Sequence, residues 1–108
     1  MREYIQVVTT GQRKDVDEIA RKLVEARLAA CAQIVGPIRS TYWWEGAVEE
    51  AEEWLCIIKT TKGLYPEVEK TVRRLHSYKI PEILAVPVVA GNADYLAWLE
   101  KELRQGQR

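Results

Sequence analysis

Several residue types are scarce in this 108-residue chain, which has no phenylalanine, one histidine, one methionine and two cysteines. Cys31 and Cys56 are far apart and each lies in an apolar run, which is typical of reduced thiols and argues against a disulfide framework. Sixteen Lys and Arg residues balance sixteen Asp and Glu residues, so the charge indicates no nucleic-acid partner.

Long apolar runs are missing as well. No segment approaches the roughly 20 apolar residues that are needed to span a bilayer. The first residues, MREYIQVV, carry charge and lack the apolar segment and small-residue cleavage site of a signal peptide. We therefore expect a cytoplasmic protein that does not insert directly into a membrane.

The apolar residues that are present, 47% of the chain, are enough for a single domain over residues 1–108. Strands are expected at 4–9, 31–44, 48–60 and 83–89, and helices at 15–30, from 62–66 onward, and after Asn92 or Asp94. Asp15 is the expected N-cap of the first helix. This order predicts an α+β fold, the ferredoxin-like split βαβ (βαββαβ) arrangement with an antiparallel four-stranded sheet and an added C-terminal helix.

Proline positions agree with the sheet order four-one-three-two that this fold requires. Pro37 falls in the second strand and Pro87 in the fourth, and both of these strands are edges in that order. Proline has no N–H to donate to a ladder, so it is confined to edges and bulges. The two expected central strands contain no proline.

The expected sheet has more apolar surface than its own helices can cover. Residues 54–58, WLCII, and 83–89, ILAVPVV, are apolar on both faces of their strands, whereas a solvated face should alternate with polar residues. Leaving several such side chains in water would cost about 1.5–3 kcal/mol each. We therefore expect the second face to be covered in part by the last helix and otherwise by another copy of the chain.

The second and third strands are long enough to form an arm that projects from the domain. Four aromatic residues are expected near its tip and in contact with a neighbouring subunit: Tyr42, Trp43, Trp44 and Trp54. The alternative is that these rings fold back onto their own helices. Most of the carboxylates in residues 49–53 are expected in solvent, with Glu53 lying deepest.

Catalytic motifs such as GxSxG, HExxH or a Gly-rich phosphate loop are absent, so we expect no enzyme activity. Cys56 is expected to be an inert core thiol, whereas Cys31 is more reachable. His76 is expected to cap the second helix in its protonated form. Cys, His and Glu side chains together could bind a soft or borderline metal, although no ligand spacing in the chain requires one.

Four segments resemble the CutA family of divalent-cation tolerance proteins: RLAACAQIVGPIRSTYWWEG (27–46), KTT (59–61), LHSYKIPEILAVPV (75–88) and DYLAWL (94–99). The resemblance implies a homotrimer of ferredoxin-like subunits whose long hairpins pack against neighbours. It also implies a cytoplasmic role in tolerance of copper and other divalent metals, with no organic cofactor. The metal-associated positions that it implies are Cys31, Glu53 and His76.

The resemblance further places a group of residues in a cleft between subunits: Tyr42, Trp44, Lys59, Tyr78 and Glu82. Interface packing and buried ion pairing would explain the same residues. The chain departs from the family pattern at Ser77, where proline is usual, and at Thr9-Thr10, where some members place a cysteine. Without the cysteine that some members have at this place, we expect copper binding to be weak.

The sequence thus favours a homotrimer in divalent metal tolerance that binds copper or another divalent metal weakly. One alternative is a trimeric regulatory module that binds a small molecule in clefts between subunits. A third is an enzyme such as an acylphosphatase on the same fold, which needs an Arg and an Asn to hold a phosphate. The first loop offers Arg13 without a matching Asn.

Overall fold

A computed structural model describes residues 3–105 of the chain. Its elements are β1 (Tyr4–Gly11), α1 (Arg13–Glu25), β2 (Cys31–Trp44), β3 (Ala47–Thr61), the 3-10 helix η1 (Lys62–Leu64), α2 (Tyr65–Leu75), β4 (Leu84–Pro87) and α3 (Ala93–Glu102). The four strands form one antiparallel sheet in the order β2-β3-β1-β4. The predicted α+β arrangement, its sheet order and its added last helix are confirmed.

The edge positions of both strand prolines are confirmed too. Pro37 lies where the pairing of β2 with β3 shifts between Val35 and Ile38. Pro87 ends β4, which pairs with Ile5–Val8 of β1 over four residues. β4 is therefore shorter than the predicted 83–89, although the Val88 N–H still donates to the Tyr4 carbonyl oxygen of β1 at 2.9 Å.

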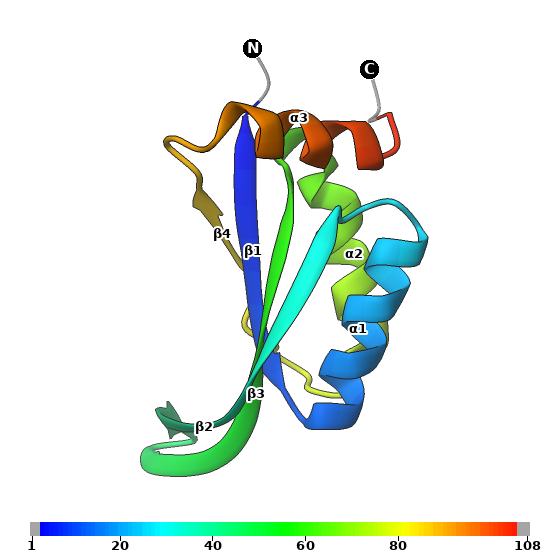
Figure 1. The fold of residues 1–108 in the computed structure, drawn as a ribbon. Helices are drawn as coiled ribbons and strands as arrows, with labels where there is room; N and C mark the ends of the chain where they lie inside the picture. The colour runs from blue at the N-terminus through cyan, green and yellow to red at the C-terminus, as the bar shows by residue number, and fades with distance from the viewer. Residues whose placement is uncertain (1–2, 106–108) are drawn as a thin grey trace.

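Helices α1 and α2 pack side by side on one face of the sheet (Figure 1). Val16, Ile19 and Leu23 recur at helical spacing on α1 and are fully buried. Alternate residues of the central strands, among them Val7 and Ile58, meet them from the sheet. The core therefore lies between the helices and one face of the sheet.

The first helix begins and ends earlier than expected. Its N-cap is Gln12, without a side-chain capping bond, so the prediction of Asp15 as N-cap is wrong. The helix ends at Glu25 because Arg27 adopts φ 59°. The Arg27 and Leu28 N–H groups then bond back to the carbonyls of the last turn in a Schellman pattern.

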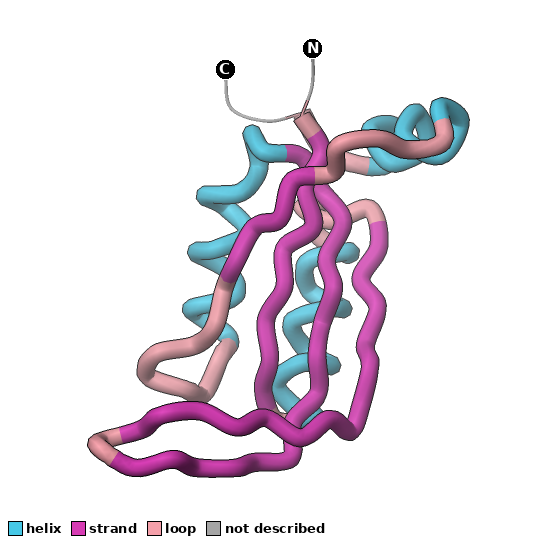
Figure 2. Tube along the Cα trace, turned by 90° about the vertical axis from the view of Figure 1, so that its left-hand side faces the viewer, coloured by secondary structure: helices cyan, strands magenta, loops and turns pink. Residues whose placement is uncertain are grey.

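The strands β2 and β3, 14 and 15 residues long, continue beyond the helices as a hairpin arm. The arm bends away from the rest of the sheet (Figure 2) and contributes to an extent of 44 Å along the longest axis. Glu45 and Gly46 at its tip have φ of 48° and 83°, which suits a two-residue hairpin turn. The predicted arm and its turn are confirmed.

The aromatic rings of the arm do not fold back onto the helices. Trp43 is 74% exposed, and Tyr42 and Trp44 are each exposed by more than 40%. Trp54 differs from the expectation, because it pairs with Gly11 at the root of the arm and packs against the core. Trp54 lies near the middle of β3, well back from the turn at Glu45 and Gly46.

The sheet face away from α1 and α2 is largely apolar. The strand register places six apolar side chains on it: Val8, Val35, Leu55, Ile57, Leu84 and Val86. Helix α3 lies across one end of the sheet (Figure 1), where Tyr4 Oη donates to Glu100 Oε1 at 2.8 Å. Val35, Leu84 and Val86 remain about half exposed in a single chain.

Gly36 is required where the arm leaves the core. A Cβ atom at this position would lie 2.1 Å from Cδ1 of the Trp54 indole. We expect Gly36→Ala to lower the free energy of unfolding by about 1–3 kcal/mol, because the indole has to move out of its packed position. Urea denaturation measures this change.

Gly63→Ala is the matched control, because a Cβ atom there would have no neighbour within 4 Å. We expect its stability to be unchanged or slightly raised. Equal effects of the two substitutions would show that the Trp54 contact does not constrain Gly36.

Candidate functional site

A cavity of about 680 Å³ lies between the arm and the loop that joins α2 to β4. The arm, β1, β3 and the loop all contribute to its lining: Thr10, Ser40, Thr41, Tyr42, Trp43, Trp44, Glu53, Tyr78, Lys79, Ile80, Pro81 and Glu82. We call this cavity the arm pocket. It brings together six predicted site residues: Tyr42, Trp43, Trp44, Glu53, Tyr78 and Glu82.

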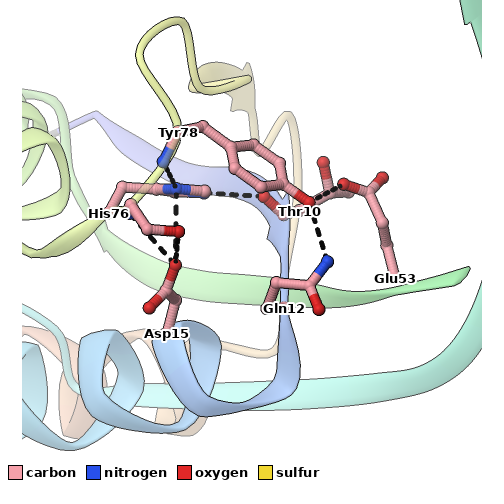
Figure 3. Close-up of polar contacts among 7 residues, drawn as sticks. Thr10, Gln12, Asp15, Glu53, His76 and Tyr78 are labelled. Atoms are coloured by element: carbon pink, nitrogen blue, oxygen red, sulfur yellow. Dashed lines mark hydrogen bonds and ion pairs between the residues drawn. The ribbon is translucent and has the colours of Figure 1, made fainter. Parts of the chain in front are cut away.

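Glu53 is the buried acid of the arm pocket, as the sequence predicted, with 5% of its surface exposed. Tyr78 Oη donates to Glu53 Oε2 at 2.8 Å, and Gln12 Nε2 donates to Tyr78 Oη at 3.3 Å (Figure 3). Burial raises the pKa of Tyr78; the Gln12 hydrogen bond opposes this effect, and the Glu53 carboxylate adds to it. Tyr78 therefore stays protonated at neutral pH and holds the carboxylate in place.

His76 fixes the loop that carries Tyr78. Its Nδ1 accepts the backbone N–H of Tyr78 at 3.1 Å. Its Nε2 lies 2.8 Å from the carbonyl oxygen of Thr10, to which it donates. Both nitrogens are engaged by backbone groups, and Nδ1 also lies 3.9 Å from Asp15 Oδ2. His76 joins the end of α2 to β1.

Cys31 and Lys59 lie at the other end of the sheet. They face each other across the β2–β3 pair, six residues along β3 from Glu53. Six strand residues span about 20 Å. Cys31 Sγ lies 3.4 Å from Tyr95 Oη, and Lys59 Nζ donates to Gln33 Oε1 at 2.7 Å. Neither residue reaches the arm pocket of its own chain.

The predicted metal positions therefore do not meet in one chain. Glu53 and His76 both contact Tyr78, whereas Cys31 is remote from both. Over residues 3–105, no three His, Cys, Asp or Glu side chains gather as a set of metal ligands. Cys56 is fully buried, and burial raises the pKa of its thiol to about 12, so the prediction of a core thiol is confirmed.

Comparison with known proteins decides the family. The family model of the CutA1 divalent ion tolerance protein matches residues 4–102. The chain belongs to the CutA1 family. The resemblance inferred from the sequence is thereby confirmed.

Similar CutA proteins come from distant organisms. The divalent-cation tolerance protein CutA of Thermus thermophilus is 41% identical over 99 residues, which are 92% of this chain and 96% of the relative. The mouse protein CutA is 44% identical over 87% of this chain, but the match spans 53% of the mouse protein. The crystal structure of CutA1 from Oryza sativa superposes with a TM-score of 0.93 at 37% identity, covering 96% of each chain.

Several lining residues of this CutA1 pocket were not predicted. Thr10, Lys79, Ile80 and Pro81 line it beside the predicted rings. The signal in the sequence was the apolar pair Ile80-Pro81 between a helix and a strand, since an exposed apolar loop indicates a surface for binding. Among the described residues of this family member, no helix is long and apolar enough to cross a membrane.

Ser77, a departure from the CutA pattern, ties the same loop to α1. Its backbone N–H donates to Asp15 Oδ2 at 3.0 Å, and its hydroxyl donates to the same oxygen. Burial alone would raise the pKa of Asp15, but the two hydrogen bonds from Ser77 outweigh it and hold the pKa below its usual value. The proline usual in the family could supply neither donor.

We expect Asp15→Ala to destabilise the protein by about 1.5–3 kcal/mol at pH 7, the range for hydrogen bonds to a charged group. The folded state lowers the pKa of Asp15, so this stabilisation is present above pH about 4 and is lost as the pH falls further. Urea denaturation of wild type and variant at pH 7 and pH 3 measures it.

Asp17→Ala on the same helix is the matched control, because the Asp17 side chain is 57% exposed and pairs with Arg13 at 3.9 Å. We expect the control to change stability by less than about 0.5 kcal/mol at both pH values. A penalty for Asp15→Ala that is the same at pH 3 and pH 7 would contradict the role of its charge.

Proposed function

We propose that this CutA1 family protein acts in divalent metal tolerance as a cytoplasmic homotrimer, and that it binds copper or another divalent metal weakly. Family membership supports the metal role, since the Thermus relative is named a divalent-cation tolerance protein. The homotrimer and the cytoplasmic location in this proposal rest on the resemblance to the family. The chain carries no motif of a known enzyme class, so we propose a binding role rather than catalysis.

The apolar face of the sheet is the observation that carries the assembly proposal. Val35, Leu84 and Val86 are about half exposed on a face that α1 and α2 leave uncovered. Burying such a side chain stabilises by about 1.5–3 kcal/mol, so a second copy placed on this face gains substantially. The arm, with Trp43 74% exposed, extends beyond the core to where a neighbour would lie.

The scattered donors support the proposal of weak rather than tight metal binding. Cys31 has Tyr95 beside it at one end of the sheet, and Glu53 has Tyr78 beside it at the other. His76 could ligate a metal only after giving up a backbone hydrogen bond. When the protein supplies only one or two ligands, water fills most coordination positions of the metal, and the affinity is low.

We expect Trp44→Ala to weaken assembly and Glu49→Ala to leave it nearly unchanged. A large ring at an interface contributes much, whereas an exposed carboxylate contributes little. Sedimentation velocity over a range of concentrations should show the trimer dissociating at about tenfold higher concentration for Trp44→Ala and within about threefold of wild type for Glu49→Ala. Comparable losses would contradict the ranking, and a stable wild-type monomer would refute the assembly.

We expect anaerobic titration with Cu(I) and Cu(II) to show weak binding that falls in Cys31→Ser, Glu53→Gln or His76→Ala. The titration is read by calorimetry on the assembled protein. Loss in Cys31→Ser alone would place the metal at the α3 end of the sheet, and loss in Glu53→Gln would place it at the arm pocket. Equal binding by wild type and all three variants would reject these ligands.

A second candidate function is a trimeric regulatory module that binds a small molecule in clefts between subunits. The arm pocket favours it, because it gathers Tyr42, Trp44, Tyr78 and Glu82 of the expected cleft. Its volume of about 680 Å³ lies within the range of small-molecule sites. Apolar and aromatic walls surround a few polar groups, as in such sites. A thermal-shift screen of metabolites tests this function, and no stabilisation by any class of compound would reject it.

A further inference from the structure

Helix α3 buries little surface of its own. Within Ala93–Glu102 only Leu99 is buried, and the rings of Tyr95 and Trp98 are each 41% exposed. Residues 89–92, which lead from β4 into the helix, are exposed as well. Segments with few buried apolar contacts open at a lower free energy than the core of a domain. The position of α3 therefore depends on contacts beyond the helix itself.

The end of α3 and the residues that follow it supply such contacts. Leu103 lies in the core, with 6% of its surface exposed. The Arg104 N–H donates to the Arg27 carbonyl oxygen at 2.9 Å. Arg27 Nη1 donates in turn to the carbonyl oxygen of Glu102 at 2.8 Å and to Glu102 Oε1 at 3.0 Å. We call residues 102–104 the C-terminal strap.

The C-terminal strap joins α3 to both helices of the core. Arg27 lies just after α1, where its φ of 59° ends that helix, and it holds the strap by its carbonyl oxygen and its guanidinium. Arg104 Nη2 lies 3.6 Å from Glu67 Oε1 in the first turn of α2. Exposed ion pairs contribute little, so the burial of Leu103 and the backbone bond to Arg27 supply most of the free energy that holds the strap in place.

We propose that α3 and the C-terminal strap open and close as one unit on the rest of the domain, with residues 89–92 as the hinge and the strap as the fastening. Opening withdraws Tyr95 Oη from Cys31 Sγ, which lie 3.4 Å apart, and Glu100 from the Tyr4 hydroxyl. It also uncovers the end of the sheet that α3 crosses (Figure 1). This inference goes beyond the proposed function and requires neither a bound metal nor a small-molecule ligand.

Hydrogen exchange of the full chain, followed for each amide by NMR, tests the proposal. We expect the α3 amides and the Arg104 N–H to share one opening free energy, and to exchange about tenfold or more faster than the slowest amides of α1. The Arg104 N–H reports on the strap itself, because its acceptor is the Arg27 carbonyl oxygen. Equal exchange of α3 and α1 would show that α3 has no opening of its own and would overturn the proposal.

Two substitutions separate the opening of this unit from the unfolding of the whole domain. Leu103→Ala weakens the strap, and we expect it to speed exchange in α3 by about tenfold or more. Ile19→Val is the control, because Ile19 is fully buried in the core and stays packed when only α3 opens. We expect the control to speed the slowest exchange in α1 by about threefold or more and to leave exchange in α3 unchanged.

Two further results would also overturn the proposal. Faster exchange of α3 in Ile19→Val would show that α3 opens only when the whole domain unfolds. An Arg104 N–H that exchanges well before the α3 amides would show that the strap frays without releasing the helix. The comparison of α3 with α1 in the wild-type protein decides the matter even if Leu103→Ala fails to fold.

Discussion

A four-stranded sheet with helices on one face leaves its other face to be covered from elsewhere. In this protein α1 and α2 bury Ile5, Val7 and Ile58 on the first face, while Leu84 and Val86 stay about half exposed on the second. Apolar side chains of that size are too costly to leave in water in a domain of marginal stability. The arm and the arm pocket both belong to this second face.

The junction around His76 depends on that layout. The His76 imidazole links the end of α2 to the carbonyl of Thr10, and Asp15 holds Ser77 one residue further along. Together they fix the loop that places the Tyr78 hydroxyl on Glu53. His76 therefore shapes the pocket through its two hydrogen bonds to backbone groups.

Much of this architecture could be predicted from local sequence patterns. Strand β2 was predicted at its observed bounds, because the expected helix before Cys31 and the turn at Gly46 delimit it. The positions of β2 and β4 at the edges of the sheet agreed with Pro37 and Pro87. Capping was less predictable. Asp15 looks like an N-cap by composition, but its carboxylate finds better donors on Ser77, 62 residues away. A contact at that separation leaves no periodic signal.

The sequence by itself determined the α+β fold, the sheet order, the long arm and the depth of Glu53, because alternation, helical spacing and proline act through near neighbours. The tertiary structure decided which of the candidate residues meet. It gathered Tyr42, Trp44, Glu53 and Tyr78 around one cavity and left Cys31 about 20 Å from Glu53 along β3. Distances between side chains on different strands depend on register and bending, and spacing along the chain does not encode them.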